Sequence, residues 1–284
     1  MTARFDVVVW NHERLGLFLQ SFDRIRGFRP GLDRLTVVSA SPGACERTLL
    51  DELGERTGIA ARYLPRANRG LDQGARCEYF TGAVGSLDEN LDSRYLLQMQ
   101  DHYLAPDDEA SRYGPNVSPP LVPGRVKEDV IPDGAVIDLN ELEALADAYD
   151  LAGFFCDRAP CLVEWEGHRF VAPNGGNFAV RTSLVRDAEA QAAIRRVWRV
   201  CDGTYRWTLY AEFMWGRIFF QEGRHFYDLA GNRLFTTWPR EDFFDWLGGD
   251  YARLFHEYDS GWAYRRARLI ARRARFFARR VRRR

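Results

Sequence analysis

An acid and a histidine stand side by side directly after a short apolar segment. The run Tyr95-Leu-Leu-Gln-Met99 has the composition of a buried strand, and Gln100, Asp101 and His102 follow it. Carboxylate and imidazole groups hold divalent cations, which neutralise negative charge that develops on a leaving group. Successive strand residues face opposite sides, so Asp101 and His102 converge only if the strand ends between them. A cap or turn acid is the alternative for Asp101.

A second group of polar residues lies where another strand leads into a helix, in the segment Asn68-Arg-Gly-Leu-Asp-Gln-Gly-Ala75. Gly70 and Gly74 allow backbone to approach a ligand, and Arg69 can contact phosphate. Asp72 can cap the helix or accept a hydrogen bond from a base or ribose. A capped transition from loop to helix explains the same residues without a ligand.

Strand-like and helix-like segments alternate along the first hundred residues. This alternation is typical of an α/β fold with a Rossmann-like, mostly parallel sheet flanked by helices. We predict strands at 5–9, 35–38, 61–64 and 95–99, and helices at 12–25, 45–56 and 73–83. Ligands bind such sheets beyond the carboxyl ends of the strands. Asn11 and Glu13 follow the first strand there, although a solvated loop explains them equally well.

The second half of the chain gives weaker signals. Six of the twelve prolines fall at 106–132, which predicts a long loop. Further predictions are a helix from 138, a hairpin at 161–171, a turn at 173–177 that leads into a strand at 178–180, and helices at 182–200, 209–221 and 241–255.

The segment from Tyr95 to Asp107 resembles the region around the DxD motif of GT-A-fold glycosyltransferases, especially bacterial family 2-like enzymes. There an acid holds a divalent cation against the diphosphate of a nucleotide-sugar. The resemblance aligns Asp101 with the last acid of the motif, whereas Met99 stands where the first would be. Residues 68–75 are similar to an Asn-x-Gly-x-Asp-x-Gly segment that borders the nucleotide pocket.

Two further segments of the first half bear on this resemblance. Residues 7–13 resemble the first strand and turn of these enzymes. The second strand departs from the pattern, because Ser39-Ala-Ser41 replaces the acidic pair that contacts the nucleoside.

The same resemblance assigns roles in the second half. Residues 174–181 are similar to a segment that lines the donor-sugar and acceptor pocket, which includes Gly176 and Asn177. Glu212 stands on the helix that carries the general base, and His225 stands where a third metal ligand is often found. A hairpin turn, an acid on the polar face of a helix and a structural histidine are the ordinary alternatives.

The resemblance therefore implies an inverting transfer of a sugar from a nucleotide-sugar to a hydroxyl of a glycan, lipid-linked or small-molecule acceptor, with Mn²⁺ or Mg²⁺. It implies a domain at 1–256, with a nucleotide-binding half at 1–105 and an acceptor and donor-sugar half at 106–256. The donor would contact Asn11, Glu13, Asn68, Arg69, Asp72, Asp101, Gly176 and Asn177, the metal would contact Asp101, His102 and His225, and Glu212 would be the base. A catalytically silent GT-A-like carbohydrate-binding or scaffold protein and a nucleotidyltransferase are the alternatives.

The formal charge is zero only because two parts of the chain cancel. Of the 40 basic side chains, eleven arginines lie at 265–284 without an acid, which leaves 29 basic and 40 acidic groups, or 29 − 40 = −11, for residues 1–264. Apolar residues recur every three or four positions at 262–284, which predicts a basic amphipathic helix. An anionic membrane surface, packing or oligomerisation, and nucleic acid are its candidate partners. The acidic body disfavours nucleic acid.

The length of 284 residues provides a core without disulfide or metal staples. Five cysteines without paired spacing predict reduced, buried thiols. No apolar run approaches the roughly 20 residues that cross a bilayer, and none has the form of a signal peptide. We therefore expect a cytoplasmic protein, with peripheral contact at the inner face of the cell membrane through residues 262–284.

Overall fold

The computed structural model of the protein describes residues 3–41, 43–101, 137–148, 151–153, 161–165, 168–172, 178–220, 226–228 and 233–235. Several predictions lie outside these residues. They are the loop at 106–132, the turn at 173–177, the helix at 241–255, the tail at 262–284 and the site candidates His102, Gly176, Asn177 and His225.

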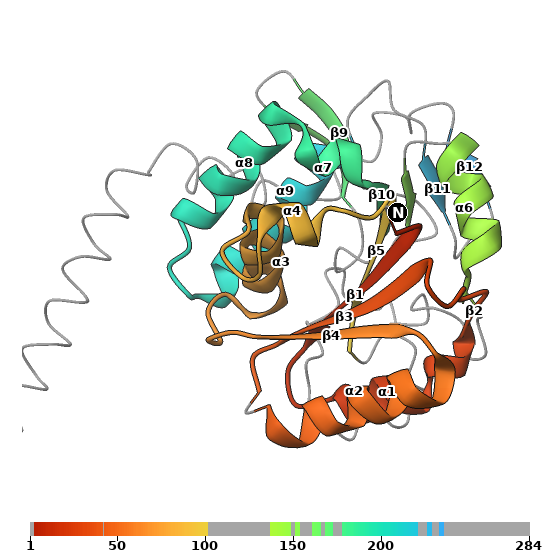
Figure 1. Ribbon diagram of the computed structural model, residues 1–284. Coiled ribbons are helices and arrows are strands. Elements are labelled where there is room, and N and C mark those ends of the chain that lie inside the picture. Colours follow the sequence, from red (N-terminus) through yellow and green to blue (C-terminus); the bar gives the residue numbers. More distant parts are fainter. Residues whose placement is uncertain are drawn as a thin grey trace, which may run out of the picture.

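An eight-stranded sheet, in the order β12-β11-β7-β10-β5-β1-β3-β4, runs through the described residues (Figure 1). The four strands predicted for the first hundred residues are confirmed as neighbouring parallel strands, and Val7 of β1 pairs with both Leu35 and Leu97. β10 runs antiparallel to its two neighbours, and β12 runs antiparallel to β11, so the sheet is mixed but mostly parallel. The strands are β1 Phe5–Asn11, β3 Asp33–Ser39, β4 Ala60–Pro65, β5 Tyr95–Gln100, β7 Leu151–Gly153, β10 Phe178–Arg181, β11 Phe226–Asp228 and β12 Arg233–Phe235.

Helices cover both faces of the sheet, as the α/β prediction requires (Figure 1). One face is covered by α1 Leu15–Gln20, α2 Ala44–Thr57 and α6 Leu139–Ala148, and the other by α3 Leu71–Thr81, α8 Ala188–Arg199 and α9 Tyr205–Phe219. The shorter elements are the 3₁₀ helix η1 Phe22–Arg24, α4 Leu87–Asn90, α7 Thr182–Arg186, the pair β2 Ile25–Arg26 and β6 Ile137–Asp138, and the predicted hairpin, β8 Cys161–Trp165 with β9 His168–Ala172.

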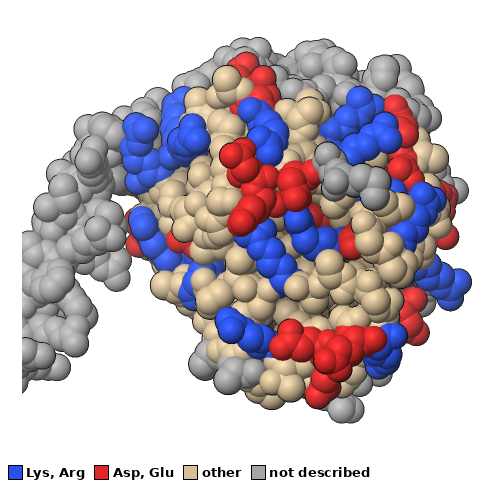
Figure 2. Space-filling view, in the orientation of Figure 1, with Lys and Arg blue, Asp and Glu red and all other residues tan. Residues whose placement is uncertain are grey.

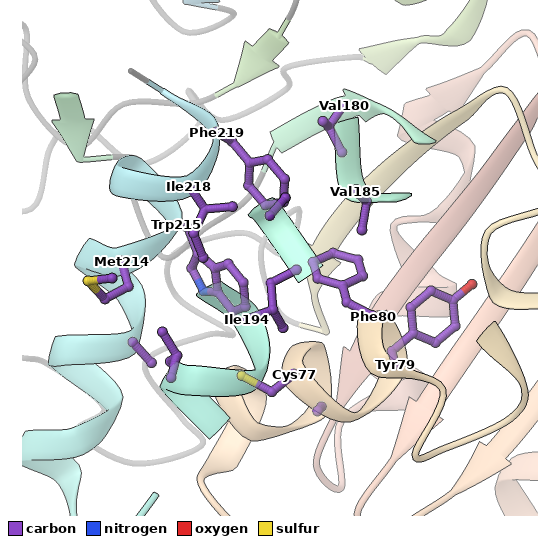
Figure 3. Close-up of a cluster of buried hydrophobic side chains, with 14 of the residues drawn as sticks. Cys77, Tyr79, Phe80, Val180, Val185, Ile194, Met214, Trp215, Ile218 and Phe219 are labelled. Carbon is purple, nitrogen blue, oxygen red and sulfur yellow. The ribbon is translucent and has the colours of Figure 1, made fainter. Parts of the chain in front are cut away.

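Alternation along β1 explains the two cores. Val7 and Val9 join the cluster under α1 and α2, whereas Val8 and Trp10 join the cluster under α3, α8 and α9. Side chains that point to opposite faces at a period of two produce this division. The second cluster is rich in aromatic residues: Phe80 meets Trp215 edge-on at 5.8 Å between ring centroids, and Figure 3 shows both beside Phe219. These contacts fix α9 against α3.

Some predicted boundaries were wrong. The helix predicted at 182–200 is two helices, because Asp187 accepts hydrogen bonds from the N–H groups of Glu189 and Ala190 and starts α8. The helix predicted at 12–25 is limited to α1 and η1. The prediction of buried thiols holds for Cys77 and Cys201 and is wrong for Cys45, which is exposed.

Candidate active site

The connections of the sheet reverse direction beside β1. The chain proceeds from β1 to β3 and β4 through α1 and α2 on one face, and then returns through α3 on the other face to β5, on the opposite side of β1. Ligands of open α/β sheets bind outside the carboxyl ends of the strands at such a reversal. The residues that end β1 and β5 lie there.

Asp101 ties these two strand ends together. Its carboxylate Oδ2 accepts a hydrogen bond from the His12 backbone N–H at 2.7 Å, and its own N–H donates to the Trp10 carbonyl at 3.2 Å. The side chain is 5% exposed. β5 ends at Gln100, so Asp101 already lies beyond the strand.

The described residues provide one of the three predicted metal ligands. They contain no group of three or more His, Cys, Asp and Glu side chains that could hold a metal ion. Asp101 supplies the type of oxygen that Mg²⁺ and Mn²⁺ prefer, whereas His102 and His225 are outside the described residues. Met99 is fully buried in the core under α1 and α2, so it contributes no ligand.

An acid that the sequence did not indicate lies at the end of β3. Glu46, in the first turn of α2, accepts hydrogen bonds from the Asn11 amide at 2.7 Å, the Ser39 hydroxyl at 2.7 Å and the Tyr63 hydroxyl at 3.0 Å. Asn11 also donates to Ser39 at 2.8 Å. We call these four residues the α2-side network. Burial of Tyr63 raises the pKa of its phenol, so the phenol remains a donor at neutral pH.

The α2-side network places a carboxylate beside the serines that had replaced the expected acidic pair. One feature of the sequence could have indicated Glu46: it is an acid in the first turn of the helix that follows the strand, where the helix dipole stabilises a negative charge. Glu13 lies at its rim, is exposed and has a left-handed backbone, with φ of 66°. The Glu13 N–H donates to the Ser41 hydroxyl at 2.5 Å.

The two glycines of the 68–75 segment serve packing. A Cβ on Gly70 would lie 2.5 Å from the Trp207 ring, and a Cβ on Gly74 would overlap the Arg69 carbonyl oxygen. Protein atoms therefore fill the space that the glycines leave, and the interpretation as room for a ligand was wrong. Asn68 is exposed, and the half-buried Arg69 donates to the Cys201 carbonyl at 3.3 Å while lying 4.4 Å from the Trp198 ring.

Asp72 does not cap α3, contrary to one of the two predicted roles. The N-cap residue of α3 is Gly70, so no side chain at that position accepts a hydrogen bond from the first turn of the helix. The Asp72 carboxylate instead accepts from the amides of Gln100 at 2.7 Å and Gln73 at 3.0 Å, and it lies 3.7 Å from the Arg76 guanidinium. Its side chain keeps 21% of its surface exposed.

A buried cation and a buried amide stand behind Asp72. Arg76 is fully buried, and the Gln73 side-chain oxygen accepts from Arg76 at 3.0 Å and from the Trp215 indole N–H at 2.5 Å. Asp72, Gln73, Arg76, Gln100 and Trp215 form what we call the α3-side network. It links the end of β5, the start of α3 and the middle of α9 into one polar unit.

Glu212 lies on α9, three residues before Trp215. Residues three apart are neighbours on a helix surface, so Glu212 stands beside the indole that joins α9 to α3. Its side chain is half-buried. The structure therefore places the predicted base on the helix that contacts the α3-side network.

A shallow cavity of about 560 Å³ lies at the opposite edge of the sheet, between residues 91–95 and 181–186. Two arginines that line it have a structural role. Arg181 donates to the carbonyls of Ala146 and Asp147, and Arg186 donates to those of Leu91 and Asp88. None of the predicted site residues lines it.

The buried thiols can be set aside as nucleophiles. Burial raises the pKa of Cys201 to about 11 and that of Cys77 well above its usual range. Only a thiolate attacks an electrophile efficiently. At neutral pH both groups are therefore inert thiols.

No protein-family model matches the chain, and no curated protein matches it. Among solved structures it is similar to S. aureus TarS 1–349, with a TM-score of 0.39 and 12% identity over 81% of this chain and 59% of that one. For the TarS 1–349 complex with UDP-GlcNAc the TM-score is 0.36, with 12% identity over 68% of this chain and 52% of that one. The chain thus spans less than two thirds of TarS 1–349.

Among the helices that the structure describes, none combines the length and the apolar character that a bilayer crossing requires.

Proposed function

We propose that the protein is a GT-A-like glycosyltransferase that transfers a sugar from a nucleotide-sugar to an acceptor hydroxyl. One observation carries the proposal: three residues selected from separate segments, Asn11, Asp72 and Asp101, lie around the carboxyl ends of β1 and β5, where Asn11 ends β1, Asp101 accepts from the His12 N–H and Asp72 accepts from Gln100. A mostly parallel sheet binds nucleotides at this place.

In this proposal the α2-side network contacts the nucleoside. Its carboxylate, amide and hydroxyls are groups that read the hydrogen-bonding edges of a base or ribose. Glu46 takes the role that the resemblance gives to an acidic pair after the second strand. Glu46 makes its three hydrogen bonds to neutral donors.

In this proposal Asp101 would face the diphosphate and hold Mn²⁺ or Mg²⁺, with His102 and His225 as the other proposed ligands. When bound, the cation would neutralise the charge that develops on the departing nucleoside diphosphate. Glu212 is the proposed base. It would take the proton of the acceptor hydroxyl, and the other donor contacts would be Glu13, Asn68, Arg69, Gly176 and Asn177.

The test is titration calorimetry of the full chain with a panel of nucleoside diphosphates, with and without Mn²⁺, followed by hydrolysis and transfer assays with the matching nucleotide-sugars. We expect one diphosphate to bind with metal dependence, and Asp101→Asn to lose that dependence. Asp88→Asn, a change to a carboxylate whose side chain is 94% exposed on α4, is the matched control. Failure of every diphosphate to bind would reject the proposal.

A catalytically silent GT-A-like binding protein is the second candidate, and a specific observation favours it. Met99 occupies the place of the first acid of the motif and is fully buried. Nucleotide binding without hydrolysis or transfer, in the presence of an acceptor panel, would select this candidate. Loss of turnover in Glu212→Gln with unchanged nucleotide affinity would select the enzyme.

A further inference from the structure

Two large apolar side chains are exposed in the described part of the chain, and both lie at one junction. Leu71 is 46% exposed at the start of α3, and Tyr205 is 53% exposed at the start of α9. The two segments touch, because Arg69 donates to the Cys201 carbonyl and Gly70 packs against the Trp207 ring. The exposed side chains therefore belong to one region of the surface.

Leu71 has an unusual backbone for its side chain. Its φ is 51°, in the left-handed region, and it follows Gly70 at 71°. A branched, bulky residue in that region is an outlier that costs on the order of 1 kcal/mol or more. Here the strained residue leaves 46% of its surface exposed to solvent, while its carbonyl accepts from Arg66 at 3.1 Å. Such an outlier points to a binding role.

The same region is positively charged. Residues 188–206 contain four exposed arginines, Arg195, Arg196, Arg199 and Arg206, against Glu189 and Asp202, a balance of 4 − 2 = +2. The chain outside the arginine tail carries a balance of −11. Figure 2 shows arginine side chains gathered over α8. We call Leu71, Tyr205 and these four arginines the basic-apolar surface.

We propose that the basic-apolar surface docks onto an anionic lipid bilayer. Leucine and tyrosine side chains enter the interface between headgroups and acyl chains, and arginine side chains pair with headgroup phosphates. The basic-apolar surface contains both kinds of side chain, the apolar pair Leu71 and Tyr205 and the four arginines. Docking through it would turn the start of α3, and with it the carboxyl ends of the strands, toward the membrane.

Two other occupants fit less well. A symmetric dimer through this surface would place the arginines of one copy against those of the other, which is repulsive. Nucleic acid would meet four arginines and then the acidic remainder of the body. An anionic bilayer accepts one face of the protein and leaves the acidic faces in solvent.

The test is sedimentation of the full chain with phosphatidylcholine vesicles, with and without phosphatidylglycerol. We expect binding to the anionic vesicles only. Arg195→Gln/Arg206→Gln should weaken it by up to about 25-fold, at roughly fivefold for each arginine. Arg26→Gln/Arg56→Gln removes two exposed arginines from β2 and α2, on the other side of the sheet, and is the matched control.

Leu71→Asn separates docking from folding. Asparagine tolerates the left-handed region, so this variant should be at least as stable as the original chain and should bind anionic vesicles several-fold more weakly. A structural role for Leu71 would instead lower the melting temperature. Nucleoside diphosphate affinity should not change, so this test and that of the proposed transferase can fail separately.

Hydrogen exchange shows which segments meet the vesicles. We expect vesicles to protect the backbone at 68–72 and 198–207 of the full chain. Protection confined to other segments would overturn the proposal, as would unchanged sedimentation of both double variants. Protection at 198–207 that increases with protein concentration in the absence of vesicles would indicate self-association and would also overturn it.

Discussion

The acids at the two edges of the sheet differ in burial and in the charge of their partners: Asp6 and Asp33 are buried, whereas Glu46 and Asp72 are half-buried. At the amino ends of the strands, Asp6 accepts from Arg34 at 2.6 Å, and Asp33 accepts from two nitrogens of Arg4 at 2.6 and 2.9 Å. At the carboxyl ends, Glu46 is held by neutral hydroxyl and amide groups, and Asp72 lies 3.7 Å from its arginine.

The comparison separates acids that hold the fold from acids available to a ligand. A buried acid with an arginine at hydrogen-bond distance has its charge compensated and holds two strands together. An acid held in place by neutral donors keeps its charge and a fixed orientation, which is what a ligand site requires.

Asp6→Ala should cost the most stability, about 3–5 kcal/mol in the free energy of unfolding by urea. Asp6 is fully buried and also accepts from Thr36 at 3.1 Å and Tyr79 at 2.7 Å, so its loss leaves these donors and Arg34 without this acceptor. Asp92→Ala is the control, because it removes a half-exposed partner of the same arginine and should cost about 1 kcal/mol or less. Equal losses from both variants would contradict the assignment of Asp6.

Gln73→Leu should cost about 2 kcal/mol, since the buried Arg76 and Trp215 donors lose their acceptor. Trp215→Phe removes one of these donors. Combined with Gln73→Leu, it should cost less than the sum of the two single changes in urea unfolding. Additive losses would show that the α3-side network does not act as a unit.

Alkaline pH should lower the free energy of unfolding through Tyr95, which lies at the amino end of β5. Burial and a hydrogen bond to Asp147 raise the pKa of Tyr95 to about 12. The unfolded phenol ionises near pH 10, so the folded state holds an extra proton between pH 10 and 12 and its stability falls there, by about 1 kcal/mol near pH 11. Tyr95→Phe should flatten this fall in urea unfolding as a function of pH, and Tyr205→Phe should leave it unchanged.

Glu46→Gln should change stability least, by about 1 kcal/mol or less, because the amide oxygen still accepts from Ser39 and Tyr63 and only the hydrogen bond from Asn11 is lost. In calorimetry we expect about tenfold weaker binding of the nucleoside diphosphate selected by the panel, or about 1.4 kcal/mol. Glu52→Gln, at an exposed position of the same helix, should change neither quantity. A stability loss as large as that of Asp6→Ala would make both edges structural and end the comparison.

The sequence predicted the elements whose patterns are local. The strands containing Val7, Leu35 and Leu97 are buried on both faces and form continuous apolar runs, which is typical of parallel strands. The break at Asp187 was missed because a capping acid also fits the polar face of a longer helix. The strands β7, β11 and β12 have three residues each, which is too short for an alternation of apolar and polar residues to indicate a strand.

Only some residues of the candidate site could be selected from the sequence. Asn11, Asp72 and Asp101 could be selected because they follow strands. Glu46 and Gln73 could not, since their partners depend on which face each helix covers. The glycines were misjudged because only the packed structure shows Trp207 over Gly70 and the Arg69 carbonyl against Gly74.

The position of β10 sets a constraint on synthesis. β5 ends at Gln100, and β10, which pairs with it, begins at Phe178, so residues 101–177, or 178 − 101 = 77 residues, separate them. At about 5–20 residues per second the ribosome needs roughly 4–15 s for this stretch. Until then the nascent sheet exposes the backbone edge of β5, a template for pairing with other chains. The emerging polypeptide therefore passes through an interval in which a chaperone that shields this edge would increase the yield.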